Sequence, residues 1–360
     1  MTKPAPTQKP TSLGSYKDYG TGQSIFDRTW VKITLGIVFA VLLVIAPLLL
    51  PIPVNQTLAR VGVFAVAVLG LNVIMGYNGQ VSLGQIFFVG LGAYATAYGV
   101  NQDWNIILVF LLTLLITGLA GLIIALAAAR LGGLAIAMVT VALPVVGVPL
   151  AKRLSGLTGG SQGTSARFSS APEWSGLAND QWQYYIVLVI TAVIFLLVRN
   201  LVKGRFGRAL QIVRENEAVA GSVGVSPYWY KVLAFSIAAM IGGVSGFLYM
   251  VVVQYTSPET LAFHHSINLL AAMVVGGSAS IIGSLLGGIY YVMVPNFTND
   301  VAPTLTALIQ GVILLAVLFI LPGGLASLPR VLRRQFRRRS SRTPTSDEPA
   351  PHDSNKGDSS

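Results

Sequence analysis

Residues 61–102 read VGVFAVAVLGLNVIMGYNGQVSLGQIFFVGLGAYATAYGVNQ and contain no Asp, Glu, Lys or Arg. A helix needs about 20 apolar residues to cross the hydrocarbon core of a bilayer, and this run holds about two such lengths. The sequence therefore predicts an all-α polytopic membrane protein, because a transmembrane β-barrel would show alternating segments of about ten residues. Other windows without charged residues cover 33–59, 104–129, 131–151, 232–258, 260–299 and 301–329.

The composition agrees with a membrane protein and excludes several kinds of site. Of the 360 residues, 53% are hydrophobic and 10% are charged, whereas soluble domains carry about 25% charged residues. The absence of cysteine excludes disulfides, thiol catalysis and cysteine metal sites. The sequence contains no G-x-x-x-x-G-K-[ST] motif for ATP.

The apolar runs predict about 8–10 transmembrane or broken helices. The run 33–50 is too long for a signal peptide and no small-residue cleavage site follows it, so it is interpreted as the first membrane helix. The predicted segments lie near 33–52, 58–76, 82–100, 105–129, 132–150, 184–202, 229–252, 267–282, 283–296 and 304–322.

The predicted membrane domain covers 33–329 and is flanked by two tails. Residues 1–32 are rich in Pro, Thr, Ser and Lys, and residues 330–360 are basic and then polar, so both tails are expected to be disordered. Between the membrane segments, the sequence predicts an external loop at 151–183 and a cytoplasmic loop at 203–228.

The basic residues predict that both termini are cytoplasmic. With the N-terminus inside, all but four of the 24 Lys and Arg residues fall on the cytoplasmic side, as the positive-inside rule favours. The exceptions are Arg60, Lys152, Arg153 and Arg167. The arginine-rich stretch 330–342 is interpreted as a topology determinant beside anionic membrane lipid and not as a nucleic-acid site.

Two predicted segments are short or interrupted by glycine. Segment 82–100 contains Gly84, Gly90 and Gly92, and segment 283–296 gives only about 21 Å of helix, less than the core thickness of about 30 Å. Irregular backbone at membrane depth occurs where it is buried in protein or lines a wet cavity. Both segments are therefore expected to be broken helices beside a pathway.

These segments also resemble each other. GQVSLGQIFFVGLGAY (79–94) and GGSASIIGSLLGGIYY (276–291) both run from Gly and Ser into glycine-spaced apolar residues that end in Tyr. Corresponding broken segments suggest an internal two-fold repeat around a central site, and the alternative is that the glycines only allow close helix packing. The substrate-path candidates are the polar residues Asn72, Tyr77, Asn78, Gln80, Ser82, Gln85, Ser278 and Ser280.

The most informative soluble stretch is GRFGRALQIVRENEAVAGSVGVSPYWYK (204–231). A stripe of apolar residues predicts one short helix, which Gly224 and Pro227 end. Glu217, Ala220 and Gly224 place a carboxylate and small residues on successive turns, a pattern that suits a groove in a partner protein. The alternative is a basic loop that only fixes the topology.

Four motifs occur in the order expected of one family: GYNGQVSLGQIFFVGLGAY (76–94), LTGGSQG (157–163), GRFGRALQIVRENEAVAGSVGV (204–225) and LFILPGGLASL (318–328). Over about residues 33–330 the chain resembles the permease subunit of a bacterial branched-chain amino-acid ABC importer, specifically the M-type partner of its two permeases. Close relatives of this family transport urea.

The resemblance implies an ABC importer permease fold in the bacterial inner membrane and a role in ATP-driven uptake of branched-chain amino acids. The implied partners are a homologous second permease, two cytoplasmic ABC ATPases and an external solute-binding protein, which would face 154–165. ATP and Mg would be bound by the ATPases. The chain itself is expected to be no enzyme and to hold no cofactor or metal.

The resemblance also assigns residues to roles. The coupling helix that docks on the ATPase would include Arg205, Arg208, Arg214, Glu217, Ala220 and Gly224. The family signature Gly-x-x-Ser-Leu-Gly falls on Gly79, Ser82, Leu83 and Gly84, and the second motif adds Gly159 and Gly160. The sequence departs from the family at Gln85, where His is common, and at Gly323, where Arg is common.

Other functions remain open on the sequence alone. An uncharged polar lining would suit urea or a short amide as well as an amino acid. An ion-coupled secondary transporter usually keeps ionisable residues within the membrane, whereas Asp103, Glu259 and Asp300 lie at predicted external ends. A membrane enzyme would have to use His264 and His265, which point about 100° apart on a helix and would not chelate one metal together.

Overall fold

The structure is a computed structural model, in which residues 1–49 form one compact unit and residues 50–360 form a second. In the first unit, residues 41–49 are helical, within the predicted first membrane segment. Both predicted tails, 1–32 and 330–360, lie entirely outside the described residues. The structure describes residues 38, 41–130, 133–168, 171–172, 175–301, 305–321 and 323–328.

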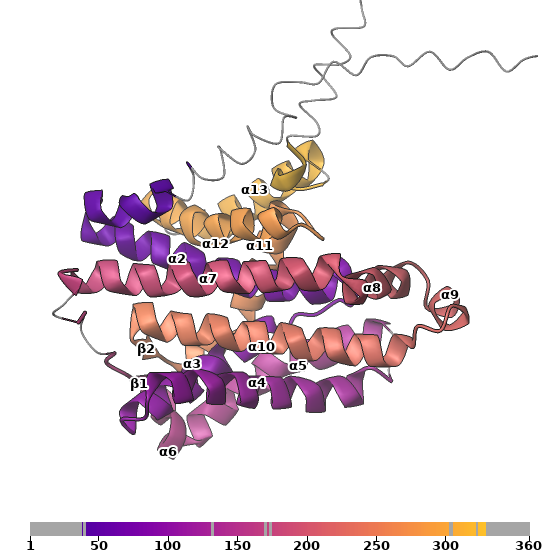
Figure 1. Cartoon of the computed structure of the whole chain (residues 1–360), viewed down its shortest axis with the longest axis horizontal. Coiled ribbons are helices and arrows are strands. Elements are labelled where there is room, and N and C mark those ends of the chain that lie inside the picture. Colours follow the sequence, from indigo (N-terminus) through magenta and orange to yellow (C-terminus); the bar gives the residue numbers. More distant parts are fainter. Residues whose placement is uncertain are drawn as a thin grey trace, which may run out of the picture. The chain divides into compact units, whose positions relative to one another are not determined.

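The second unit is almost entirely helical (Figure 1). The long helices are α2 (Ile52–Leu71), α3 (Gln85–Asn101), α4 (Ile106–Ala128), α5 (Gly133–Arg153), α7 (Asn179–Lys203), α10 (Pro227–Val253), α11 (Phe263–Gly276), α12 (Ile281–Val301) and α13 (Thr306–Ile320). The short helices are the π-helix η2 (Asn72–Tyr77), α6 (Ser155–Thr158), η3 (Gly160–Gln162), α8 (Arg205–Glu215), α9 (Glu217–Ser222), η5 (Pro258–Leu261) and η7 (Leu325–Ser327).

Seven helices of the described residues are long and apolar enough to cross a membrane. This confirms the predicted class of an all-α polytopic membrane protein. Helices α3 and α11 are shorter, at 17 and 14 residues, and complete the set of long apolar helices in the described second unit. The seven spans are Ile52–Tyr77, Ile106–Ala128, Ala135–Arg153, Asn179–Lys203, Pro227–Val253, Ile281–Thr298 and Leu308–Ser327.

The prediction that glycines interrupt segment 82–100 is wrong in its details. Helix α3 continues without a break past Gly90 and Gly92, and the non-helical residues are 78–84, ahead of the helix. The glycines are places of close packing: a Cβ atom on Gly92 would lie 2.8 Å from the Cα atom of Gly243 on α10, and one on Gly90 would overlap the Leu261 side chain of η5. Small residues at such crossings let two membrane helices approach.

The second predicted break is also displaced. Segment 283–296 is not a separate short helix, because α12 runs for 21 residues from Ile281 and continues through Pro295. The helical interruption lies at 277–280, where Gly277 has a φ of 117° and Ala279 a φ of 55°. Non-helical residues thus precede both α3 and α12, as the similarity of 79–94 to 276–291 suggests.

Helices α2 and α10 form the centre of the second unit. The membrane-spanning windows of the helices that contain them are each 72% buried, whereas those of α4 and α7 are each 22% buried. Helices α7 and α12 pack on α2, and α3 and α4 pack on α10. The hydroxyl of Ser245 on α10 donates to the carbonyl oxygen of Val63 on α2 at 2.9 Å, which joins the two central helices.

The two ends of the helical unit carry different elements (Figure 1). Helices α8 and α9 lie at one end, called the α8–α9 end below. The opposite end carries the two-residue strands β1 (Thr164–Ser165) and β2 (Tyr255–Thr256), which pair antiparallel with Thr164 opposite Thr256. It is therefore called the β end.

Candidate functional site

Asn72, in the π-helix that precedes the link 78–84, binds the interruption between α11 and α12. Its side chain is fully buried in the π-helix. The side-chain nitrogen donates to the carbonyl oxygen of Ser280 at 2.9 Å and to the hydroxyl of Ser284 at 3.0 Å. The side-chain oxygen accepts a hydrogen bond from the backbone N–H of Ala279 at 2.8 Å. Asn72 therefore satisfies backbone groups that the interruption between α11 and α12 exposes.

The link 78–84 between the π-helix and α3 contains buried amide groups without partners. Asn78 and Gln80 are 2% and 6% exposed. Both polar side-chain atoms of Asn78, and the side-chain oxygen of Gln80, have no hydrogen-bond partner among the described residues. A buried polar group left unpaired costs about 1–3 kcal/mol. This link is therefore less stabilised than the helices on either side of it.

The remaining polar residues of this stretch fasten it to other helices. The side-chain nitrogen of Gln85 donates to the carbonyl oxygen of Ala238 on α10 at 2.9 Å. The backbone N–H of Leu83 donates to the hydroxyl of Thr140 on α5 at 3.1 Å. Tyr77 and Ser82 are buried. Among the predicted substrate-path residues, Ser280 is partly buried and Ser278 is exposed beside it.

The predicted single helix of the cytoplasmic loop is wrong, because two helices form there. Helix α8 ends at Glu215 and α9 begins at Glu217, with Asn216 between them in an extended conformation. The side-chain oxygen of Asn216 accepts hydrogen bonds from the backbone N–H groups of Ala218 at 2.9 Å and Val219 at 3.3 Å. Asn216 is thus the N-cap of α9, a role for which Asn is strongly preferred.

Of the three residues that the sequence singles out around α9, Glu217 and Gly224 are exposed and Ala220 is buried. Ala220 is fully buried, and the carboxylate of Glu217 binds the ammonium of Lys231 on α10 at 2.5 Å. Gly224, with a φ of 78°, follows the end of the helix. The exposed apolar side chains are those of Val219 and Val223, at 52% and 60% exposed.

The three arginines of α8 differ in their contacts. Arg205 and Arg208 are exposed, and Arg208 donates to the carbonyl oxygen of Lys203 at 3.3 Å. The Arg214 guanidinium donates a hydrogen bond to the carbonyl oxygen of Gly76 in the π-helix. A basic side chain at the carbonyl end of a helix binds its last unpaired carbonyl groups.

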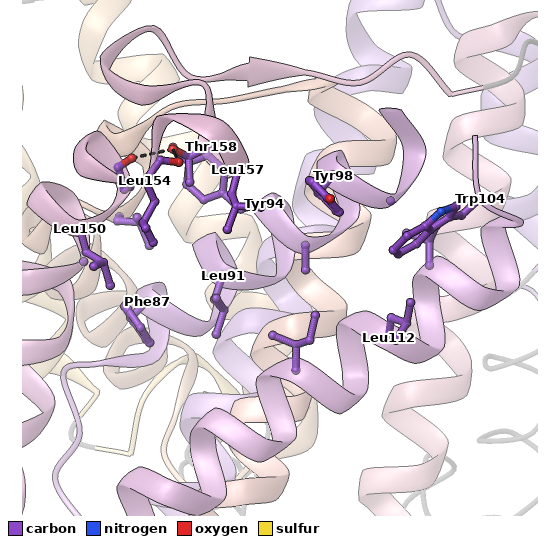
Figure 2. Close-up of a pocket in the computed structure, with 17 residues that line it drawn as sticks. Phe87, Leu91, Tyr94, Tyr98, Trp104, Leu112, Leu150, Leu154, Leu157 and Thr158 are labelled. Atoms are coloured by element: carbon purple, nitrogen blue, oxygen red, sulfur yellow. Dashed lines mark hydrogen bonds between the residues drawn. The ribbon is translucent and has the colours of Figure 1, made fainter. Parts of the chain in front are cut away.

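An apolar cavity of about 420 Å³ lies between α3, α4 and α5 towards the β end (Figure 2). Its volume is in the range of small-molecule sites. None of the predicted substrate-path residues lines it, and sequence reasoning missed it because its walls are ordinary apolar helix faces. It is lined by Phe87, Leu91, Tyr94, Ala95, Tyr98, Gly99, Trp104, Val109, Leu112, Ile116, Gly147, Leu150, Ala151, Leu154, Leu157, Thr158 and Leu261.

Hydroxyl groups are the only polar side-chain groups at the cavity wall apart from the Trp104 indole N–H. The Tyr94 hydroxyl is buried and has no hydrogen-bond partner among the described residues. The Thr158 hydroxyl donates to the carbonyl oxygen of Ala151 at 2.6 Å. Figure 2 shows Phe87, Leu91, Tyr94 and Tyr98 along α3. Among the described residues, no Asp, Glu, Lys, Arg or His lines the cavity, so it is suited to an aliphatic group.

The predicted signature glycines of the second motif shape the turn next to this cavity. Gly159 has a φ of 75°, and a Cβ atom there would overlap the carbonyl oxygen of Gly163. The backbone N–H of Gly160 donates to the Thr158 hydroxyl at 3.2 Å. Gly159 and Gly160 thus allow the chain to reverse after α6 while Thr158 stays in the cavity wall.

Two further polar contacts occur towards the β end. The side-chain nitrogen of Asn55 on α2 donates to the carboxylate of Asp180 on α7 at 2.8 Å, and both residues are buried. Sequence reasoning missed this pair, since polar residues near helix starts are common. The ring nitrogen Nδ1 of His265 lies 3.1 Å from the hydroxyl of Tyr291 on α12. Each contact ties together two helices of the second unit.

A family model for the permease component of branched-chain amino acid transport systems matches residues 54–318. The high-affinity branched-chain amino acid transport system permease protein LivM of Escherichia coli (strain K12) is 28% identical over 295 residues, which cover 74% of this chain and 68% of LivM. LivM of Salmonella typhimurium (strain LT2) is 26% identical over 293 residues with the same coverage. No solved structure matches. The family match extends from α2 into α13.

Proposed function

The chain belongs to the permease component family of branched-chain amino acid transport systems, and on this premise we propose that it is the transmembrane permease subunit of an ATP-driven ABC importer. Its substrates would be branched-chain amino acids. The described spans make it a multi-pass membrane protein, and the bacterial inner membrane is the proposed location. ATP hydrolysis would belong to partner subunits, which would also bind the nucleotide and Mg.

The proposed assembly contains a homologous second permease, two cytoplasmic ATPases and an external solute-binding protein. The α8–α9 end would face the cytoplasm. The basic residues of α8 and of the adjoining end of α7 support this orientation under the positive-inside rule. Val219 in α9 and Val223 directly after it are exposed, and both would then be available to an apolar groove on an ATPase.

The observation that carries the substrate class is the apolar cavity between α3, α4 and α5. Its walls would take up an aliphatic side chain, since burial of apolar surface stabilises a complex by about 25 cal/mol per Å². Urea would lose its hydrogen bonds to water there and gain few in return, and an unpaired polar group is costly to bury. The unpaired hydroxyl of Tyr94 offers one hydrogen bond to the polar end of an amino acid. The cavity therefore favours an aliphatic amino acid over urea.

The test is uptake by the complete transporter in proteoliposomes, with ATP inside and the binding protein outside. We expect ATP-dependent accumulation of leucine, isoleucine and valine, and no competition by urea. Uptake driven by a sodium or proton gradient without ATP would instead indicate a secondary transporter. Uptake of urea in preference to leucine would overturn the proposed substrate.

A matched pair of variants on α4 tests the cavity. Leu112 lines it, whereas Leu115 is 55% exposed and does not. Leu112→Trp should fill part of the cavity and lower leucine uptake by roughly tenfold, the size of effect expected for one or two misplaced methylene groups. Leu115→Trp should leave uptake near wild type. Equal uptake by the two variants would show that substrate does not use the cavity.

A further inference from the structure

We propose that Arg214 and Asn72 are positioning residues that link the α8–α9 end mechanically to the interruption between α11 and α12. This inference rests on the proposed function, in which ATPases act on α8 and α9. The contacts run from Arg214 to the π-helix, and from Asn72 in the π-helix to residues 277–284. Displacement of α8 would move the start of α12 through these contacts.

The first contact holds α8 to the chain around Gly76. The guanidinium of Arg214 donates to the Gly76 carbonyl oxygen. The aliphatic part of the same side chain lies over Gly79, where a Cβ atom would be 2.7 Å from the Arg214 Cγ atom. Gly79 has a φ of 76°. Arg214 thus contacts the chain on both sides of Asn78, at Gly76 and at Gly79. A movement of α8 would therefore act directly on the end of the π-helix.

The second contact lies within the π-helix. A Cβ atom on Gly76 would overlap the side-chain oxygen of Asn72 and would lie 2.6 Å from the backbone nitrogen of Ala279. The residue that accepts from Arg214 therefore also packs directly on the interruption between α11 and α12. π-Helical turns are rare in proteins and are frequently found at functional sites.

The third contact is the set of three hydrogen bonds made by Asn72. They reach Ala279 and Ser280 in the interruption and Ser284 in the first turn of α12. Gly277 lies under Gly323, whose carbonyl oxygen would be 2.9 Å from a Cβ atom on Gly277. The interruption is therefore packed on both sides, and a shift of Asn72 is passed to α12 instead of being absorbed locally.

In the proposed movement, the link 78–84 changes conformation together with the π-helix. The side-chain amide of Asn78 and the side-chain oxygen of Gln80 are buried without a hydrogen-bond partner among the described residues. Buried polar groups without partners are usually explained by a catalytic role, bound water or stored strain. A second conformation in which these amides find partners would lower the free energy of the moved state. The link is thus the segment in which a change of register costs least.

The experiment compares Arg214→Ala with Arg199→Ala in the complete transporter. Arg199 is an exposed arginine of α7, so its removal changes the charge equally. We expect Arg214→Ala to lower the ratio of leucine uptake to ATP hydrolysis by about fivefold or more, in the range of allosteric coupling energies. Arg199→Ala should keep the wild-type ratio. Asn72→Ser should behave like Arg214→Ala, and the double variant should be no worse than either single variant.

A second measurement separates positioning from folding. Hydrogen exchange of the amides of 277–284 should change when ATP is added to the wild-type transporter and should not change in Arg214→Ala. Wild-type coupling in Arg214→Ala, or uptake and hydrolysis that fall together with the amount of assembled complex, would overturn the inference. Failure of the wild-type transporter to take up leucine with ATP would overturn the proposed function instead.

Discussion

Gly79 has a conformation and a neighbour that both exclude a larger residue. Its φ of 76° lies in the left-handed region, which glycine adopts without the steric penalty that a Cβ atom brings. The aliphatic part of Arg214 occupies the space into which a side chain would project. The family signature at this position is therefore explained by a backbone turn and by a close approach, with no need for direct contact with substrate.

Gly79→Ala should lower the free energy of unfolding by about 1–2 kcal/mol, the cost of placing an L-residue in the left-handed region. The measurement is thermal unfolding of the detergent-solubilised complex. Gly156→Ala is the control, because nothing lies within 4 Å of a Cβ atom on Gly156. Identical melting temperatures for the two variants would contradict this account of Gly79.

The polar residues selected from the sequence have several roles at this scale. Asn72 and Gln85 bind backbone carbonyl groups of distant helices, so their polarity is used in packing. The side-chain amide of Asn78 and the side-chain oxygen of Gln80 have no hydrogen-bond partner among the described residues. The sequence indicated correctly that these residues are unusual for a membrane segment. It did not indicate their partners, which lie elsewhere in the chain.

At the scale of single elements, α9 depends for its stability on its N-cap, Asn216, and on its first residue, Glu217. It has only six residues, and isolated helices of this length are unstable in water. The N-cap of Asn216 and the ion pair of Glu217 with Lys231 hold it in place. The side chain of Lys231 is only 9% exposed, so loss of Glu217 would leave a nearly buried charge without this partner.

Asn216→Ala should destabilise α9 by about 1 kcal/mol, the usual value of an N-cap. The amides of Ala218 and Val219 should then exchange with solvent roughly fivefold faster, because both donate to the cap. Hydrogen-exchange mass spectrometry of the loop measures this effect. Asn216→Asp should retain slow exchange, since Asp caps as well as Asn. Equally fast exchange in both variants would mean that the cap does not stabilise α9.

Element boundaries show where local sequence reasoning stopped. Glycines within α3 suggested a broken helix, but Gly92 packs against α10, Gly90 packs against Leu261, and the helix continues. The sequence predicted a boundary between 282 and 283, whereas the structure has the interruption at 277–280. The contact of Ala279 with Asn72, which holds the interruption, is not visible in the local sequence. Gly224, by contrast, follows the end of a cytoplasmic helix as expected, whereas Pro227 is the first residue of α10.

At the scale of the whole second unit, close contact of α3 with α10 determines how tightly the core packs. A Cβ atom on Gly246 of α10 would overlap the carbonyl oxygen of Val89 and would lie 2.6 Å from the backbone nitrogen of Ala93. Backbone atoms cannot move aside as a flexible side chain can. The two helices therefore need a residue without a side chain at this crossing.

Gly246→Val should destabilise the folded protein by at least about 1–3 kcal/mol, the usual cost of overpacking a core. The expected readouts are a lower melting temperature and a smaller monodisperse fraction in detergent. Gly311→Val is the matched control, because nothing lies within 4 Å of a Cβ atom on Gly311. Similar stability of the two variants would show that α3 and α10 can separate without cost.

The sequence by itself determined that this chain is a polytopic helical membrane protein. Its charge-free windows are long enough to span a bilayer, and a spanning segment must satisfy its backbone hydrogen bonds internally, which a helix does. The family motifs could also be recognised without the structure, because they are contiguous in the chain. Local sequence was sufficient for both conclusions.

Only the tertiary structure decided which polar residues are paired, where the helix before α12 stops, and that an apolar cavity lies between α3, α4 and α5. Each of these features depends on residues far apart in sequence: Asn72 binds Ala279 across 207 positions. Inside a membrane, irregular backbone persists only where a partner satisfies it. Because that partner is supplied by folding, no local pattern could have located it.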